Sequence, residues 1–132
     1  MTPVLVDSDI LIDIATDHPR CGKAAAAALL SAGQGARLIV NPLILAELSL
    51  ALGRIEALEA VLPGDLFRRE ALPWPAAFLA GRALRAGTAR DGRAGLVDLC
   101  IGAHAAVRGY RLLTRQPWRY RAAFPRLGLL HP

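Results

Sequence analysis

The sequence is poor in aromatic residues and has no long apolar run. The first shortage indicates the composition of the core, and the second argues against a membrane protein. Aromatic residues make up 5% of the 132 positions and hydrophobic residues 54%, so the core is expected to be mainly aliphatic. No stretch of 18 apolar residues is present, so no membrane span is expected. The first residues also lack a basic region followed by a long apolar stretch, which argues against a secretory signal. We therefore expect a soluble, cytoplasmic protein.

Cysteine and lysine are also scarce. Cys21 and Cys100 stand far apart and form no CxxC pair, which indicates two buried, reduced thiols. Lys23 is the only lysine, so nearly all the positive charge behind the net charge of +5 comes from arginine. A basic balance suits a polyanionic partner, either a nucleic acid or an acidic protein. A base composition that favours Arg and Ala codons would explain the same excess, so charge alone does not decide the function.

The pattern of apolar runs predicts one α/β domain over residues 1–132. A chain of this length buries a single core, and the sequence contains no internal repeat or interdomain linker. Short apolar strands alternate with helices, which is typical of a parallel sheet covered on both faces. Ser8 and Asn41 are expected to cap the helices that follow them. Strands are predicted at residues 4–6, 37–40, 111–114 and 127–130, and helices at residues 9–15, 22–32, 42–53, 54–62, 76–86 and 96–107.

Three acidic residues interrupt apolar stretches. Asp7 ends the first strand, and Glu47 and Asp98 are the only charges in two apolar helices. Burying an unpaired carboxylate costs several kcal/mol of folding free energy, so each of these acids is expected to have a partner. Asp98 could instead favour a helix N-terminus, worth about 0.3–1 kcal/mol, and Glu47 could pair with an arginine such as Arg54.

Taken together, the acids indicate a metal site. Functional groups gather at the carboxyl ends of parallel strands, and Asp7, Glu47 and Asp98 can all reach the same edge of the predicted sheet. Carboxylates that converge raise one another's pKa unless a cation lies between them. Oxygen ligands without Cys or His favour Mg²⁺ or Mn²⁺, which typically activates water in phosphodiester cleavage.

Other polar and aromatic residues have structural explanations. Asp13 lies four residues after Asp9 on one helix face and is expected to face solvent. His104, on an apolar helix, is expected to be a hydrogen-bonded core histidine. Trp74 and Trp118 are flanked by proline and are expected to be packing residues.

Four segments in order resemble the PIN-domain ribonucleases, specifically the VapC-like toxins of bacterial type II toxin–antitoxin pairs. They are VDSDILID, NPLILAEL, LVDLCIGAHAAVRGYRLLTR and YRAAFPRLGLL, and the similarity runs nearly end to end. The resemblance implies a three-layer α/β/α PIN-like domain with a short central parallel sheet. It also implies an endoribonuclease that depends on Mg²⁺ or Mn²⁺, forms a homodimer and is inhibited by a VapB-like antitoxin docked across the acidic groove.

The resemblance assigns roles by position. Asp7, Glu47 and Asp98 match the first three acids of the family, which are catalytic and hold the metal. Thr114 matches the threonine or serine near the final acid, and Asp9 falls where a polar residue often supports the site. The family pattern then has an aspartate or asparagine, whereas this chain has Gln116. Because glutamine contributes no charge, we expect a weakened affinity for the metal.

Arginines are candidates to hold an RNA backbone. Arg90 and Arg93 lie in a Gly-rich loop, and Arg115, Arg119 and Arg121 follow the third predicted strand. Each of them could equally be a solvated surface charge.

Two other functions remain open at this stage. With Gln116 in place of an acid, the protein could be an attenuated member of the family that acts mainly by binding antitoxin or RNA. The opening DSDIL also resembles phosphatases of the haloacid-dehalogenase type, which use an aspartate nucleophile. Those enzymes need a catalytic lysine as well, and Lys23, alone in an alanine-rich helix, is poorly placed for that role.

Overall fold

The computed structural model describes residues 2–87 and 94–132 and contains a five-stranded sheet. Its strand order is β3-β2-β1-β4-β5, and every pairing between neighbouring strands is parallel. The strands are β1 (Val4–Val6), β2 (Leu38–Val40), β3 (Phe67–Arg69), β4 (Arg111–Leu113) and β5 (Leu129–Leu130). The predicted α/β class with a short parallel sheet is therefore confirmed.

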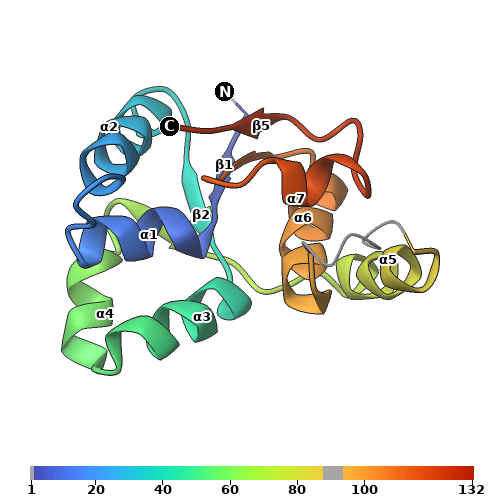
Figure 1. Ribbon diagram of the computed structural model, residues 1–132, viewed down its shortest axis with the longest axis horizontal. Coiled ribbons are helices and arrows are strands. Elements are labelled where there is room, and N and C mark those ends of the chain that lie inside the picture. Colours follow the sequence, from blue (N-terminus) through green and yellow to red (C-terminus); the bar gives the residue numbers. More distant parts are fainter. Residues whose placement is uncertain (1, 88–93) are drawn as a thin grey trace.

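Helices cover the sheet on both sides. Figure 1 shows α1, α2 and α4 on one side of the strands and α5, α6 and α7 on the other, which gives the expected three layers. The helices are α1 (Ser8–Ala15), α2 (Gly22–Gly33), α3 (Pro42–Leu52), α4 (Ile55–Val61), α5 (Trp74–Arg85), α6 (Leu96–Arg108) and α7 (Trp118–Arg121). Within the described ranges, no helix is both long and apolar enough to cross a membrane.

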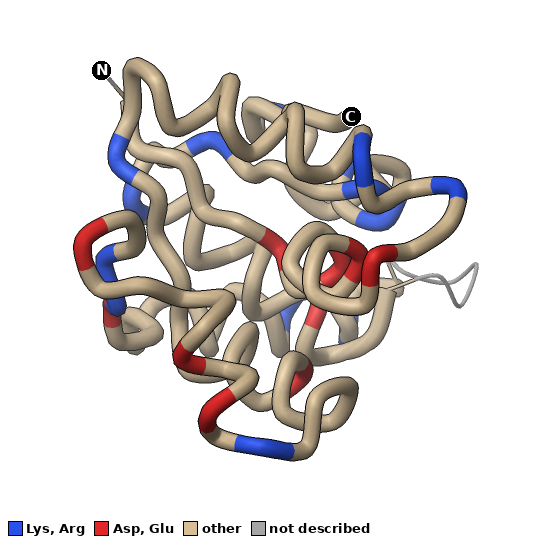
Figure 2. Tube along the Cα trace, turned by 90° about the vertical axis from the view of Figure 1, so that its left-hand side faces the viewer, with Lys and Arg blue, Asp and Glu red and all other residues tan. Residues whose placement is uncertain are grey.

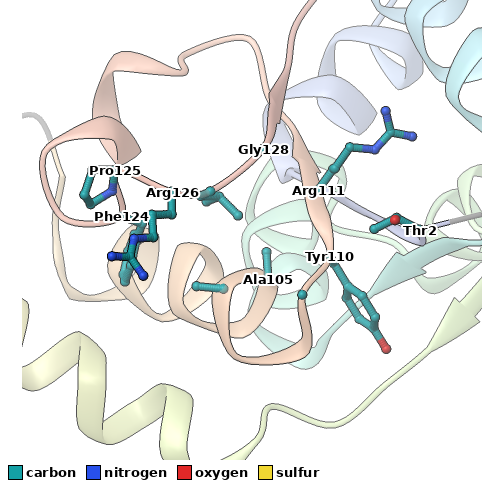
Figure 3. Close-up of a pocket in the computed structure, with 11 residues that line it drawn as sticks. Thr2, Ala105, Tyr110, Arg111, Phe124, Pro125, Arg126 and Gly128 are labelled. Carbon is teal, nitrogen blue, oxygen red and sulfur yellow. The ribbon is translucent and has the colours of Figure 1, made fainter.

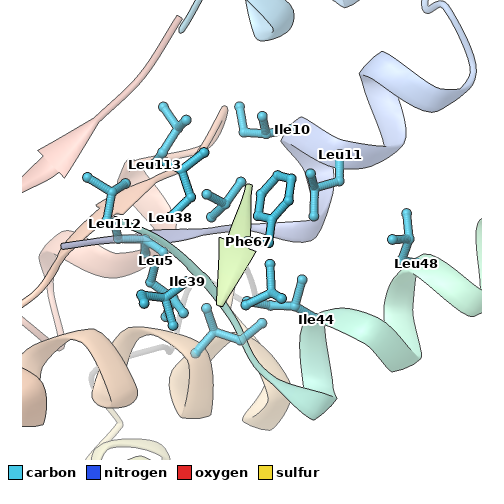
Figure 4. Close-up of a cluster of buried hydrophobic side chains, with 14 of the residues drawn as sticks. Leu5, Ile10, Leu11, Leu38, Ile39, Ile44, Leu48, Phe67, Leu112 and Leu113 are labelled. Atoms are coloured by element: carbon cyan, nitrogen blue, oxygen red, sulfur yellow. The ribbon is translucent and has the colours of Figure 1, made fainter. Parts of the chain in front are cut away.

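The strand β1 lies at the centre of the sheet and of the core. All three of its residues are 0% exposed, and aliphatic side chains from β2, β4 and the helices pack around it, including Ile39 and Leu112 (Figure 4). The residue that follows β1, Asp7, continues the pairing with β4, because its N–H donates to the carbonyl of Leu113 at 2.9 Å. The centre of the sheet therefore delivers an acidic side chain into the protein interior.

Two elements were not predicted from the sequence. The strand β3 reads FRR, and only Phe67 is buried while Arg68 and Arg69 are exposed, so this edge strand lacks the apolar run that predicts a strand. The helix α7 is a single turn with the sequence WRYR, too short to show helical periodicity.

The helix caps agree with the sequence at one position and differ at another. Asn41 caps α3 as predicted, because its Oδ1 accepts a hydrogen bond from the N–H of Ile44 at 2.9 Å. The N-cap of α1 is Asp7 and not Ser8, whose N–H donates to Asp7 Oδ1 at 2.8 Å. The first helix thus begins one residue earlier than expected and takes Ser8 as its first residue.

The tryptophans and cysteines are more exposed than the sequence indicated. Trp74 is 90% exposed and Trp118 48%, so the prediction that they are packing residues is wrong. The helix α5 buries Ala76 and Ala80, and Trp74 lies two residues before the first of them, on the opposite face. The two cysteines are unpaired as expected, but both are only partly buried.

Candidate functional site

Asp7 lies at the centre of the candidate site and is 5% exposed. Its Oδ1 accepts the N–H of Ser8, and its Oδ2 accepts two hydroxyl groups, from Thr114 at 2.8 Å and from Tyr120 at 2.7 Å. Thr114 directly follows β4, the strand beside β1, so these contacts depend on the parallel pairing of two strands far apart in the sequence. The side chain of Asp7 is therefore held in one orientation.

The Asp7 carboxyl ionises less readily than a free carboxyl group. Burial and, to a smaller extent, the negative charge of Asp9 raise the pKa of Asp7 to about 7, although hydrogen bonds from Tyr120, Thr114 and Ser8 act to lower it. Those three donors carry no positive charge, so they compensate a carboxylate only in part. A positive charge close to Asp7 would therefore stabilise its ionised form.

Asp9 shares the donors that follow β4. Its carboxylate accepts the backbone N–H of Arg115 at 3.2 Å, the hydroxyl of Thr114 at 3.3 Å and the side-chain amide of Gln116 at 3.4 Å. Burial raises the pKa of Asp9, and the bonds from Arg115 and Gln116 oppose that rise. Gln116, which stands where the family pattern has an acid, is placed here as a hydrogen-bond donor to an acid.

Glu47 approaches the site from α3. Its Oε1 accepts the hydroxyl of Ser8 at 2.8 Å, while Arg54, the alternative partner suggested by the sequence, lies 3.7 Å from Glu56 instead. Burial raises the pKa of Glu47, the bond from Ser8 lowers it, and the charge of Asp98 raises it again. Glu47 is therefore close enough to Asp98 for the two charges to interact.

Asp98 combines both roles that its sequence position suggested. It is the third residue of α6, and its Oδ2 accepts the N–H of Gly95 at 3.3 Å, so it stabilises the start of the helix. It also faces α7, where Nη1 of Arg119 lies 3.3 Å from the same oxygen. The capping role and the site position are thus compatible.

Tyr120 is a site residue that the sequence did not reveal. It is 0% exposed, and its hydroxyl donates to Asp7. A Cβ at Gly102 on α6 would lie only 2.8 Å from the Tyr120 ring, so glycine at that position lets the tyrosine pack against the helix. A buried tyrosine usually finds a hydrogen-bond partner for its hydroxyl, but local sequence does not say which partner it takes.

Asp13 is buried, and the expectation that it faces solvent is wrong. It is 3% exposed, and its Oδ2 lies 3.4 Å from Nη1 of Arg115. The same guanidinium nitrogen donates to Sγ of Cys21 at 3.5 Å. Arg115 therefore folds back over α1 and neutralises an acid there, which makes it less available to a ligand than the sequence suggested.

The other arginine candidates differ in their surroundings. Arg119 is paired with Asp98, whereas Arg121 is exposed on the same short helix. Arg90 and Arg93 lie outside the described residues. In Figure 2 several acidic positions gather at the centre right of the view, and basic positions lie above them towards the C-terminus.

The donor set suits a hard divalent cation. Asp7, Asp9, Glu47 and Asp98 offer only oxygen ligands, and burial raises the pKa of the first three, which a cation would reverse. Among residues 2–87 and 94–132, however, no group of three or more Asp, Glu, His or Cys side chains lies in an arrangement ready to hold a metal. The residues fit Mg²⁺ or Mn²⁺ in the chemistry of their donor atoms.

A second buried polar network lies outside this site. His104 is 0% exposed, as predicted for a core histidine, and its Nδ1 lies 2.9 Å from Nδ2 of Asn41 while its Nε2 lies 2.9 Å from Oε1 of Glu70. Because Asn41 Oδ1 already accepts the N–H of Ile44, its amide nitrogen faces the histidine, which must accept at Nδ1 and donate from Nε2. Tyr110 donates to the same carboxylate at 2.9 Å.

A cavity of about 550 Å³ lies at the opposite edge of the sheet. Figure 3 shows it between the end of α6, the start of β4 and the segment before β5, with Ala105, Tyr110, Phe124 and Gly128 in its wall. These positions are at the amino ends of the strands, whereas the acids follow the carboxyl ends. The cavity is therefore separate from the candidate site.

Comparisons with known proteins place the chain in a family. The PIN domain model matches residues 4–121, and a comparison with curated proteins gave no match. VapBC2 from Rickettsia felis, solved with a promoter DNA fragment, is similar over 97% of each chain, with 18% identity and a TM-score of 0.76. DNA-bound VapBC from Salmonella typhimurium covers 99% of this chain and 98% of its own, with 22% identity and a TM-score of 0.67.

A third structure is a toxin without an antitoxin in its description. VapC20 from Mycobacterium tuberculosis, described as a toxin that cleaves the sarcin–ricin loop, covers 82% of this chain and 85% of its own, with 17% identity and a TM-score of 0.63. At such identities the three structures establish the shared fold. Since the family model spans nearly the whole chain, the protein belongs to the PIN-domain family.

Proposed function

We propose that this protein is a divalent-metal-dependent endoribonuclease toxin of a bacterial toxin–antitoxin pair, formed by a single domain over residues 1–132. The main support is the acid site at the carboxyl end of β1, which is formed by Asp7, Asp9, Glu47 and Asp98 from three separate stretches of the chain. Perturbed carboxyl pKa values that have a specific charge partner are typical of functional sites. A purely structural role would not need so many acids in one place.

Asp7, Glu47 and Asp98 would hold Mg²⁺ or Mn²⁺. A divalent ion bound there supplies activation of a water molecule and stabilisation of charge on the scissile phosphate. The surrounding residues orient the acids, since Thr114 and Tyr120 hold Asp7 through hydroxyl groups. Asp9 supports the site from the first turn of α1 by binding the chain that follows β4.

Cationic side chains beside the acids would bind the RNA backbone. Arg119 is the best placed of the described candidates, because it is paired with Asp98 of the acid site and its side chain is 34% exposed. Arg115 is engaged with Asp13 and would contribute less. Arg90 and Arg93 stay candidates from the sequence alone.

The partners proposed are a VapB-like antitoxin and a second copy of the chain. Two of the similar structures are VapBC complexes by description, which supports an antitoxin partner. Large hydrophobic side chains are exposed on several helices, and contact with a second copy would remove part of this apolar surface from water. They include Leu30, Leu50 and Ile55 on α2, α3 and α4, and Trp74, Phe78 and Leu96 on α5 and α6. Light scattering on the purified chain tests the dimer.

An attenuated protein that mainly binds antitoxin or RNA is the second candidate. Two observations favour it: Gln116 donates to Asp9 where the family pattern has an acid, and Arg119 neutralises Asp98. Both reduce the negative charge available to a metal. In this case Mn²⁺ would bind weakly and RNA would be bound without being cut.

RNA cleavage with Mn²⁺ separates the two functions. The proposed nuclease cuts RNA, loses activity in EDTA and loses it again in Asp7→Asn. Asp65→Asn is the matched control, because Asp65 is exposed and precedes β3 at the other edge of the sheet. Cleavage that survives both EDTA and Asp7→Asn would contradict the metal mechanism, and intact RNA that still binds the chain would favour the attenuated protein.

A further inference from the structure

The segment that follows β4 supplies hydrogen-bond donors to three acids of the site. Thr114 and Tyr120 donate to Asp7, the backbone of residue 115 donates to Asp9, and Arg119 donates to Asp98. No acidic residue occurs in residues 114–121. This segment therefore compensates negative charge and adds none.

Within this segment, the guanidinium of Arg119 forms an ion pair with Asp98, an acid of the site. Its Nη1 is 3.3 Å from Oδ2 and 3.5 Å from Oδ1 of Asp98, so one guanidinium nitrogen reaches both oxygens. The side chains are 34% and 15% exposed, so solvent and salt screen the pair only partly. The charge of Arg119 also acts on a second acid, since it lowers the pKa of Glu47 against the raising effect of burial.

The packing of α7 on α6 explains why the guanidinium reaches Asp98. Asp98 and Gly102 are four residues apart on α6 and therefore lie on one face. A Cβ at Gly102 would lie 2.7 Å from the Phe124 ring and 2.8 Å from the Tyr120 ring. The missing side chain lets α7 lie against that face, which places Arg119 beside the acid.

We propose that Arg119 is an internal counter-ion of the acid site, which competes with a divalent cation for Asp98 and has to leave it when the ion binds. The proposal rests on the proposed metal site. Both Asp98 oxygens accept from Arg119, and Oδ2 also accepts from Gly95, so an ion that binds this carboxylate would lie beside the guanidinium. Like charges side by side in a half-buried site repel, so the guanidinium and the metal exclude each other.

Mn²⁺ titration calorimetry on four metal-free proteins tests the competition. Arg119→Gln removes the charge and should tighten Mn²⁺ binding by about tenfold, because the ion no longer has to displace a cation from Asp98. Arg119→Lys keeps the charge and should bind like the parent protein. Arg121→Gln removes the same charge from the exposed side of α7 and should change the affinity by less than about twofold.

The movement itself has a separate readout. Nitrogen NMR of the arginine side chains should show the Arg119 Nε–H signal change on addition of diamagnetic Mg²⁺ in the parent protein, while the Arg121 signal stays in place. This measurement uses the parent protein, so it tests the proposal even if Arg119→Gln folds poorly.

Each outcome has a defined consequence. Parent and Arg119→Gln proteins that bind Mn²⁺ with equal affinity would overturn the counter-ion while leaving the metal site intact. If only Arg119→Gln binds Mn²⁺, the counter-ion is supported in its strongest form. If neither protein binds Mn²⁺, both this inference and the metal-dependent part of the proposed function are wrong.

Discussion

The protein contains two buried clusters of polar side chains whose carboxylates behave in opposite ways. In the acid site, burial and the charge of Asp9 raise the pKa of Asp7 to about 7. In the second cluster, burial also tends to raise the pKa of Glu70, but hydrogen bonds from His104 and Tyr110 outweigh it and the pKa is lowered. Both carboxylates accept bonds from distant segments, so burial and hydrogen bonding alone do not distinguish them.

The difference lies in the charge that surrounds each carboxylate. Glu70 has Nε of Arg108 at 3.6 Å, whereas Asp7 has neutral donors and a second acid beside it. A cluster that compensates its own charge stabilises the fold. A cluster that concentrates charge of one sign lowers stability, and such an arrangement is expected to persist where it serves a function.

The largest expected effect is on activity. Asp7→Asn should lower Mn²⁺-dependent RNA cleavage by about 10²-fold or more, because it removes the central charged ligand while keeping the shape. The free energy of unfolding at neutral pH should change little, since removing a charge that burial disfavours is offset by the loss of an acceptor for the hydroxyls of Thr114 and Tyr120. A gel assay with labelled RNA and a urea titration measure the two quantities. An Asn variant that unfolds more easily and still cuts RNA would make the acid site structural.

The pH dependence of stability should differ between the clusters. The folded-state pKa of Asp7, about 7, lies above its unfolded value of 3.8, so its contribution makes the metal-free protein less stable as pH rises from about 4 to about 7. The change is about 3 kcal/mol and should disappear in Asp7→Asn. Urea unfolding in EDTA across this range measures it, and identical pH profiles for the two proteins would contradict the assignment.

Glu70 should show the opposite sign. Its folded-state pKa lies below the unfolded value of 4.5, so its stabilising contribution is complete above that pH and is lost as pH falls through the folded-state pKa. Glu70→Gln should therefore flatten the acid limb of the stability profile and leave the limb between pH 4 and 7 unchanged. If Glu70→Gln instead flattened the profile between pH 4 and 7, the two clusters would titrate as one coupled system.

The second cluster should affect stability without affecting metal binding. His104→Leu leaves Asn41 Nδ2 and Glu70 Oε1 without their bonds to the imidazole, and the free energy of unfolding should fall by about 2 kcal/mol. The Mn²⁺ affinity should stay within about twofold of the parent value. His131→Leu, at the exposed end of the chain, is the control. A large loss of Mn²⁺ affinity in His104→Leu would show that the two clusters are coupled.

The smallest expected effect concerns the missing acid. Gln116→Asp exchanges a donor to Asp9 for a fourth carboxylate and should tighten Mn²⁺ binding by about fivefold, because ligand charge sets the affinity of oxygen sites for divalent ions. Gln34→Asp adds the same charge at the exposed end of α2 and should leave the affinity unchanged. If calorimetry gave equal Mn²⁺ affinities for the parent, Gln116→Asp and Gln34→Asp proteins, residue 116 would not be part of the metal site.

Local patterns in the sequence predicted much of the fold. The central strand Val4–Val6 and the Asn41 cap are short-range signals, and both appear in the structure. The same patterns identified Asp7, Glu47 and Asp98 as acids that interrupt apolar stretches. The edge strand β3 was missed because two of its three side chains face solvent and leave no apolar run.

Only the tertiary structure decided which groups compensate these acids. Tyr120 donates to Asp7 across 113 positions of sequence, and Arg115 pairs with Asp13. Arg119 contacts Asp98 because Gly102 leaves space for α7. Periodicity and capping depend on neighbours a few residues away, so they could be predicted from the amino-acid sequence. Charge compensation could not be predicted in this way, because it depends on distances between segments that meet only after the chain has folded.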